Sequence, residues 1–295
     1  ESMKQQSDWT AVEMDKLTGG MLKQLYPSVN THVMPYQDFA APDGFYDLAI
    51  GNVPFSDKVK VLSDKRYRNK TPNLHDYFFL KTLDKVRPGG LLVFITSTGT
   101  LSKQSKNIRT ALADKANLVG AFRLPGTTFK KNAGTEVVTD LIIMQRLPDG
   151  ETATGPAWLE LSTLPDPDHG AAIPINEYFK DNPQNILGRL DRKSKLWGPN
   201  QPNVSGTDDF EARWEKAIDS LPENIMKPWQ APEQEQQVKL LEQGEAKEGQ
   251  FVSKDGELYV VDNGALVPVP PPALAKSKAT NTRGANEYAR KKEHV

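Results

Sequence analysis

The first half of the chain alternates between short apolar runs and segments with apolar residues at helical spacing. Short apolar runs bounded by turn residues are typical of strands, whereas spacing at i, i+4 and i+7, as in Phe79, Leu83 and Val86, is typical of a helix. The pattern predicts strands over residues 9–15, 31–36, 46–50, 91–96, 117–125 and 136–147, and helices over 17–27, 74–86 and 102–115.

This alternation predicts an α/β fold, in which a mostly parallel, Rossmann-like sheet carries helices on its faces. The segments 117–125 and 136–147 are joined by the loop "GTTFKKNAGT" without a helix. Because a short connection joins antiparallel strands, we expect these two to form an antiparallel pair at one edge of the sheet.

The pattern changes after Leu147, where turn residues become frequent. It predicts a first domain over residues 1–150, an accessory region with helices over 151–248, and a small β-hairpin with a basic tail over 249–295. The accessory region contains an amphipathic helix over 208–221, which Asp208 or Asp209 can cap. Asp-Gly and Asn-Gly pairs after residue 250 indicate hairpin turns.

Composition narrows the classes of function. The 295 residues are 37% apolar and 25% charged, with a mean hydropathy of -0.58 and a net charge of -1, so affinity for a polyanion must come from local patches. The absence of cysteine excludes disulfides, thiolate catalysis and cysteine-bound zinc. No apolar run reaches the roughly 18 residues of a membrane span, and the first residues lack the apolar region of a signal peptide. We therefore expect a cytoplasmic protein without a membrane partner.

The stretch "YDLAIGNVPF" ends an apolar run with Asn52, Val53, Pro54 and Phe55. The Asn52 amide oxygen and the Val53 carbonyl, beside the rigid Pro54, can accept hydrogen bonds from an amino group. The Phe55 ring can stack on a flat heterocycle. These residues could bind an aromatic amine, although an ordinary Asn-Pro turn would explain four residues equally well.

Acidic residues follow the two preceding strands. Glu13 can accept hydrogen bonds from a ribose diol, or it can complement the start of the next helix. Asp38 could accept from an adenine amino group while Phe39 covers the ring, although a turn explains the tripeptide alone. Ligands of doubly wound sheets bind at the carboxyl ends of strands, where all these residues are expected.

In order and spacing, "VEMD … QDF … GNVPF" resembles class I S-adenosylmethionine-dependent methyltransferases, and most closely the DNA adenine amino-methyltransferases. Further stretches resemble the methylase region of very large phage and plasmid proteins that also carry helicase domains, and the likeness covers residues 9–188. The resemblance implies that S-adenosyl-L-methionine is the cofactor, with Glu13 on its ribose and Asp38 on its adenine, Phe39 alongside. It also implies that Asn52 to Phe55 hold a flipped adenine of double-stranded DNA.

Two features depart from that family. Val53 replaces the usual first proline of the base-holding motif, which preserves the backbone carbonyl. The glycine-rich cofactor loop should precede Trp9, yet only eight residues do, none of them glycine. We therefore expect a fragment without the first strand of its sheet, which binds the cofactor poorly alone and needs an upstream segment of a larger helicase–methylase protein.

A basic loop follows the motif and could contact DNA phosphates, with Tyr67 as a stacking residue. It contains Lys58, Lys60, Lys65, Arg66, Arg68 and Lys70. A solvated loop is the alternative. A second loop with Arg123, Lys130 and Lys131 is a further candidate for DNA contact. For the pair His75 and Asp76, packing or capping is favoured over catalysis because no nucleophile accompanies it.

The sequence therefore predicts methyl transfer to adenine in DNA, in a protein of a mobile element. Two alternatives stay open at this point. One is an inactive remnant that serves as a DNA-binding or structural module. The other is a methyltransferase acting on RNA or on protein glutamine, because a similar motif serves those enzymes.

Overall fold

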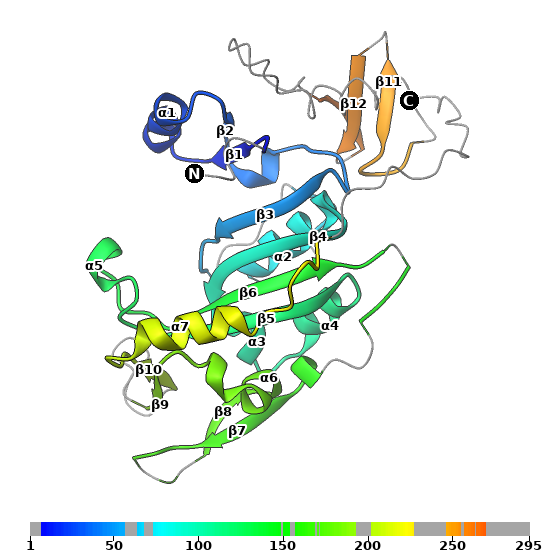
Figure 1. Cartoon of the computed structure of the whole chain (residues 1–295). Coiled ribbons are helices and arrows are strands. Elements are labelled where there is room, and N and C mark those ends of the chain that lie inside the picture. The colour runs from blue at the N-terminus through cyan, green and yellow to red at the C-terminus, as the bar shows by residue number, and fades with distance from the viewer. Residues whose placement is uncertain are drawn as a thin grey trace. The chain divides into compact units, whose positions relative to one another are not determined.

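The computed structural model describes most of the chain (Figure 1). The described residues are 7–56, 64–67, 73–148, 150–153, 157–168, 170, 172–192, 202–226, 246–254, 257–262 and 264–269. The chain divides into two compact units. The first unit comprises residues 1–43, 61–68 and 230–295, and the second comprises 44–60 and 69–229. The bounds of these two units differ from those of the three segments predicted from the sequence.

The second unit is built on a four-stranded sheet in the order β3-β4-β6-β5 (Figure 1). Its strands are β3 (Tyr46–Asn52), β4 (Val86–Ser97), β5 (Ala116–Leu124) and β6 (Thr139–Arg146). β3 and β4 pair in parallel, and β6 is antiparallel to both β4 and β5, so three of the four strands run in one direction. This confirms the predicted α/β class and the antiparallel pair, with β6 inside the sheet and β5 at its edge.

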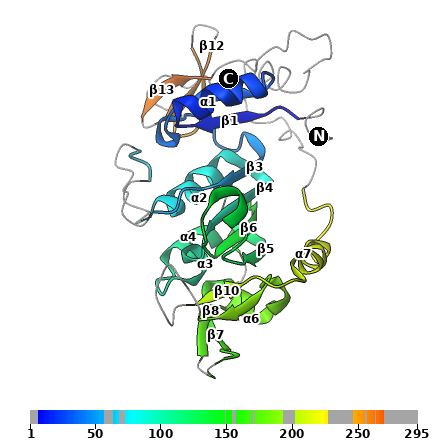
Figure 2. The same cartoon turned by 90° about the vertical axis from the view of Figure 1, so that its left-hand side faces the viewer.

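Helices cover both faces of this sheet (Figure 2). α2 (Leu74–Lys85) and α4 (Asn107–Ala113) lie on one face, where the Phe79 ring packs edge-on against Phe94 of β4 with centroids 5.1 Å apart. α7 (Phe210–Asp219) lies on the other, where Trp214 packs against Phe122 of β5 at 6.0 Å. The apolar face predicted for residues 208–221 is therefore the face that packs on the sheet.

The run "RPGG", which follows the helix predicted over residues 74–86, lies inside β4. α2 ends at Lys85 and β4 begins at the next residue. Gly89 has a φ of 74°, and a Cβ atom on Gly90 would lie 2.7 Å from the Asp47 carbonyl oxygen. Both glycines are therefore needed by the irregular start of the β3–β4 pairing rather than by a helix stop.

Short elements complete the second unit. Asn176 caps α6 (Glu177–Asp181), and its side-chain amide donates to the carbonyls of Leu101 in α3 and Trp158 in η2 at 2.7 and 2.8 Å, which ties the start of α6 to both. The short elements are α3 (Gly99–Ser102), α5 (Lys130–Ala133), η2 (Ala157–Leu159), β7 (Leu161–Pro165), β8 (Ala172–Asn176), α6 (Glu177–Asp181), η3 (Pro183–Asn185), β9 (Arg189–Asp191) and β10 (Asn203–Ser205).

The first unit contains the parallel pair β1 (Thr10–Glu13) and β2 (Asn30–Val33), joined by α1 (Lys16–Leu25), and then η1 (Tyr36–Asp38). The apolar face predicted for α1 is largely exposed, since Leu17 is 75% and Leu25 67% accessible. The strands β11 (Phe251–Lys254), β12 (Glu257–Asp262) and β13 (Ala265–Pro268) form an antiparallel meander, as the Asn-Gly and Asp-Gly pairs predict.

Among the described residues, β1 and β3 belong to separate sheets. β1 pairs only with β2, and β3 pairs only with β4. No helix in the described part of the chain is long and apolar enough to cross a membrane.

Candidate functional site

The segment Asn52 to Ser56 is fastened at both ends by backbone hydrogen bonds. Asn52 is the last residue of β3 and lies opposite Ile95 of β4. The Val53 N–H donates to the Ile95 carbonyl at 3.1 Å, and the Leu74 N–H at the start of α2 donates to the Ser56 carbonyl at 3.0 Å. The short segment therefore spans from the carboxyl end of the sheet to the first turn of α2.

Burial alternates along this segment in a way that suits a binding site. The Val53 side chain is 4% exposed and anchors the segment, whereas Asn52 and Pro54 are exposed and the Phe55 ring is 39% accessible. Within the described part of the chain, the Asn52 side chain and the Val53 carbonyl take part in no hydrogen bond, and Phe55 packs on no other ring. An amide, a carbonyl and an aromatic face are thus available to a ligand.

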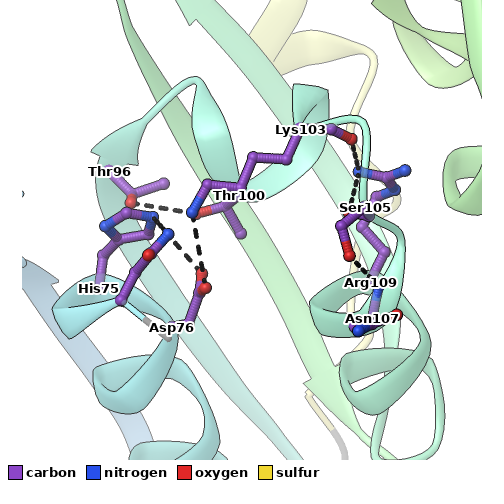
Figure 3. Close-up of polar contacts among 9 residues, drawn as sticks. His75, Asp76, Thr96, Thr100, Lys103, Ser105, Asn107 and Arg109 are labelled. Atoms are coloured by element: carbon purple, nitrogen blue, oxygen red, sulfur yellow. Dashed lines mark hydrogen bonds and ion pairs between the residues drawn. The ribbon is translucent and has the colours of Figure 1, made fainter. Parts of the chain in front are cut away.

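A buried polar cluster joins residues from the start of α2, the end of β4 and the turn that follows β4 (Figure 3). His75 and Asp76 are almost fully buried, with His75 Nε2 3.4 Å from Asp76 Oδ1. Lys103 Nζ lies 3.8 Å from Asp76 Oδ2, and its side chain is 30% exposed. Thr96 and Thr100 share a hydrogen bond of 3.3 Å beside them. The burial of His75 and Asp76 agrees with the packing role favoured from the sequence.

Arg109 of α4 fixes the backbone next to that cluster (Figure 3). Its guanidinium donates to the carbonyl of Leu159 at 2.8 Å and to those of Lys103 and Ser105 at 2.7 and 3.5 Å. Burial lowers the pKa of Arg109, and the carboxylate of Glu160 opposes that shift. An arginine with backbone carbonyl partners is a structural clamp, and here it holds the α3–α4 connection.

Glu13 and Asp15 lie at or just after the end of β1, where the sequence allowed either a helix-capping or a ribose-binding role. Asp15 caps α1, because its carboxylate accepts from the Thr18 N–H at 2.7 Å, a bond that lowers the Asp15 pKa. Glu13 Oε1 accepts from the Asp15 N–H at 2.7 Å, while Oε2 takes part in no hydrogen bond among the described residues. Helix complementation thus falls to Asp15, and Glu13 keeps one acceptor for a diol.

Asp38 and Phe39 differ in exposure. Asp38 is exposed at the end of η1, whereas the Phe39 ring is buried against His32, with centroids 5.1 Å apart, and against Tyr36 at 6.2 Å. Burial, with a smaller contribution from Lys23, lowers the pKa of His32 below its usual value. The Phe39 ring thus packs on His32 and Tyr36, and its contact with a cofactor ring stays a prediction.

Glu13 and Asp38 are the candidate cofactor residues. Glu13 and Asp38 offer carboxylate acceptors that suit a ribose diol and an adenine amino group. No loop with paired glycines directly follows a described strand.

The basic loop is described only at residues 64–67. Lys65 is exposed, but Arg66 forms an ion pair with Asp43 at 2.8 Å and lies over the Tyr67 ring at 5.3 Å. Tyr67 is buried, so the interpretation as a base-stacking residue is wrong. The other four basic residues proposed for DNA binding, Lys58, Lys60, Arg68 and Lys70, lie outside the described residues.

Of the three basic residues assigned to the second loop, one is unavailable for DNA contact. Arg123 is buried and forms a bidentate pair with Asp140 at 2.8 and 2.9 Å, so it cannot reach DNA. Lys130 pairs with Glu136 at 2.6 Å, and Lys131 is exposed. A charged residue inside an apolar strand, such as Asp140 in "VVTDLIIM", was the available signal for a buried ion pair.

Comparison with known proteins identifies one region of the chain. The family model "N-6 DNA Methylase" matches residues 30–158. The "Defense against restriction protein B" of Escherichia phage P1 is 34% identical over 143 residues. That alignment covers 47% of this chain and only 6% of the phage protein, so the chain spans a small part of this relative.

Two solved structures show partial similarity. The methyltransferase subunit of a type I restriction-modification system from Streptococcus thermophilus is 15% identical, with a TM-score of 0.40, over 73% of this chain and 43% of that one. The M protein of the type I restriction enzyme EcoKI is 18% identical, with a TM-score of 0.41, over 47% and 31%. The likeness to the N-6 DNA methylase family rests on the sequence match over residues 30–158 of this chain.

Proposed function

We propose that this chain is the base-binding part of a DNA adenine amino-methyltransferase. The observation that carries the proposal is the segment Asn52 to Phe55. Its buried Val53 is anchored to β4, while an amide, a carbonyl and an aromatic ring stay available to a ligand. This segment lies inside the region that matches the N-6 DNA methylase family.

The residues act by orienting an amino group. The Asn52 amide oxygen and the Val53 carbonyl accept hydrogen bonds from the two N–H groups of the adenine amine. The nitrogen lone pair then stays available to attack the methyl donor. Phe55 stacks on the extruded adenine and offsets part of the cost of unstacking it. S-adenosyl-L-methionine, when bound, supplies the methyl group, and Glu13 and Asp38 hold its ribose and adenine.

The proposed partner is double-stranded DNA. The exposed Lys65 and the proposed loop residues Lys58, Lys60, Arg68 and Lys70 would contact phosphates. Because the chain spans 6% of its phage relative, we propose that it is part of a longer cytoplasmic protein of a mobile element, with an upstream cofactor-binding segment and helicase domains.

The substitution Asn52→Ala in the longer protein tests the function. We expect adenine methylation to fall by about a hundredfold or more, because a preorganised polar contact to the reacting group is lost. Asn117→Ala is the matched control, since Asn117 is an exposed asparagine on β5 of the same sheet. The measurement is mass spectrometry of N6-methyladenine in DNA from expressing cells.

The same measurement separates the alternatives. Equal methylation by wild type and Asn52→Ala contradicts the proposed role of the segment. Methylated RNA or glutamine without methylated DNA adenine identifies another substrate class. DNA binding without any methylation identifies a binding module.

A further inference from the structure

The base-holding segment is the stretch from Asn52 to Ser56. The buried polar cluster around Asp76 has no part in the chemistry proposed for that segment. We name it the Asp76 cluster, and it is drawn in Figure 3. It gathers the first turn of α2, the end of β4 and the short helix α3 at the carboxyl end of the sheet. Its members are Asn73, His75, Asp76, Thr96, Thr100 and Lys103.

Both attachments of the base-holding segment lie next to this cluster. Leu74, whose N–H holds the Ser56 carbonyl, stands between Asn73 and His75. Ile95, whose carbonyl holds the Val53 N–H, precedes Thr96. A shift of α2 relative to β4 therefore moves one end of the segment against the other.

The charges of the cluster join these elements. Asp76 is fully buried, and a buried carboxylate needs compensation by a nearby cation or by hydrogen bonds. Lys103 of the α3–α4 connection lies 3.8 Å from it, and α3 is in turn joined to β4 by the hydrogen bond between Thr100 and Thr96. Its backbone carbonyl is held by Arg109, so the lysine extends from a fixed point.

The fit around the lysine is close. A Cβ atom on Gly99 would lie 3.3 Å from Lys103 Cε and 3.8 Å from His75 Nε2. A side chain at residue 99 would therefore crowd the Lys103 stem in the turn after β4.

We propose that Asp76 is a positioning residue for methyl transfer. With Lys103 and His75 it holds the first turn of α2 against the end of β4, and so keeps Asn52 and Phe55 in the orientation that receives the target base. Asp76 touches neither base nor cofactor. This inference rests on the proposed function.

Hydrogen exchange of the full chain tests the fastening without any need for activity. Asp76→Asn and Lys103→Met should each raise the exchange rates of the Val53 and Leu74 amides by about tenfold, because local opening becomes easier. Lys103→Arg should keep wild-type rates. Lys106→Met is the matched control, since Lys106 forms an exposed pair with Glu160 at 2.9 Å.

Two outcomes of this measurement are decisive. Unchanged protection of both amides in Lys103→Met overturns the proposal, and so does equal loss of protection in Lys106→Met. Lys103→Met keeps the test valid if Asp76→Asn does not fold, because the Lys103 side chain reaches solvent. Circular dichroism establishes that each variant is folded.

Kinetics of the longer protein test the consequence. Asp76→Asn and Lys103→Met should lower kcat for adenine methylation by about tenfold or more with KM for DNA unchanged, and Lys103→Arg should restore kcat, because misplacement affects the reacting geometry. Faster exchange with unchanged kcat overturns the positioning role. Absence of methylation in the wild type refutes the proposed function instead, and hydrogen exchange then still decides whether Asp76 fastens the segment.

Discussion

Single side chains decide which positive charges of this protein can reach a ligand. Arg123 lies near the end of β5 and Lys131 lies in α5, the next element of the chain. Arg123 is buried, whereas Lys131 is exposed. Arg123 pairs with Asp140 across β5 and β6, donates to Ser102 Oγ at 2.8 Å and lies 4.5 Å over the Phe179 ring. Its charge joins the sheet to α3 and α6 and is unavailable to DNA.

This pair leads to a stability prediction. Asp140→Asn should destabilise the second unit by about 3–5 kcal/mol, because it leaves the Arg123 charge buried without its partner. The double variant Arg123→Met/Asp140→Leu should lose less, since both charges are removed together. Urea unfolding followed by tryptophan fluorescence measures both variants.

Glu160→Gln is the control for that experiment. Glu160 pairs with Lys106 at the surface, and exposed pairs contribute only about 0–1 kcal/mol. A loss in Asp140→Asn no larger than in the control would show that the buried pair is not essential.

At the scale of elements, the start of β4 shows how close contact between strands constrains a sequence. Gly90 lies where β4 meets β3 after an irregular register between Tyr46 and Leu48. A side chain there would meet the Asp47 carbonyl at 2.7 Å and the Arg87 carbonyl at 3.0 Å. Backbone atoms cannot give way as a flexible side chain can, so the strand that leads to Ile95 depends on this glycine.

Gly90→Ala should therefore destabilise the second unit by about 1–3 kcal/mol through overpacking. Gly20→Ala is the matched control, because Gly20 lies within α1 and a Cβ atom there meets nothing within 4 Å. It should leave stability unchanged or raise it by about 0.5–1 kcal/mol. Thermal unfolding followed by circular dichroism would contradict this prediction if Gly90→Ala melts at the wild-type temperature.

At the scale of the whole molecule, the candidate cofactor residues and the base-holding segment belong to different units. Glu13 and Asp38 lie in the first unit, and Asn52 to Phe55 in the second. The parallel pair β1–β2 and the four-stranded sheet are separate among the described residues. In the proposed function, the carboxylates of the first unit contact only the nucleoside half of S-adenosylmethionine.

We therefore expect this chain alone to bind S-adenosylmethionine with a Kd of about 1 mM or weaker. The longer protein that we propose should bind it in the micromolar range, because it adds contacts to the methionine half. Isothermal titration calorimetry of both proteins provides the comparison. Micromolar binding by the chain alone would show that its own residues are sufficient.

Residue patterns alone predicted the local elements and the residues at their ends. Strand and helix periodicity identified β3, α2, β5, β6 and α7, because these elements bury one face or both and the spacing of apolar residues records that burial. The segment Asn52 to Phe55 could be selected as a candidate because its amide and ring follow a strand end.

Only the tertiary structure decided which side chains are available. It buried Phe39, Tyr67 and Arg123, left the apolar face of α1 exposed, and joined His75, Asp76 and Lys103 into one cluster. Burial and pairing of this kind depend on residues distant in sequence, such as Asp140 for Arg123 and Lys103 for Asp76. Local patterns carry no record of such partners, whereas the packing of the sheet and its helices determines them.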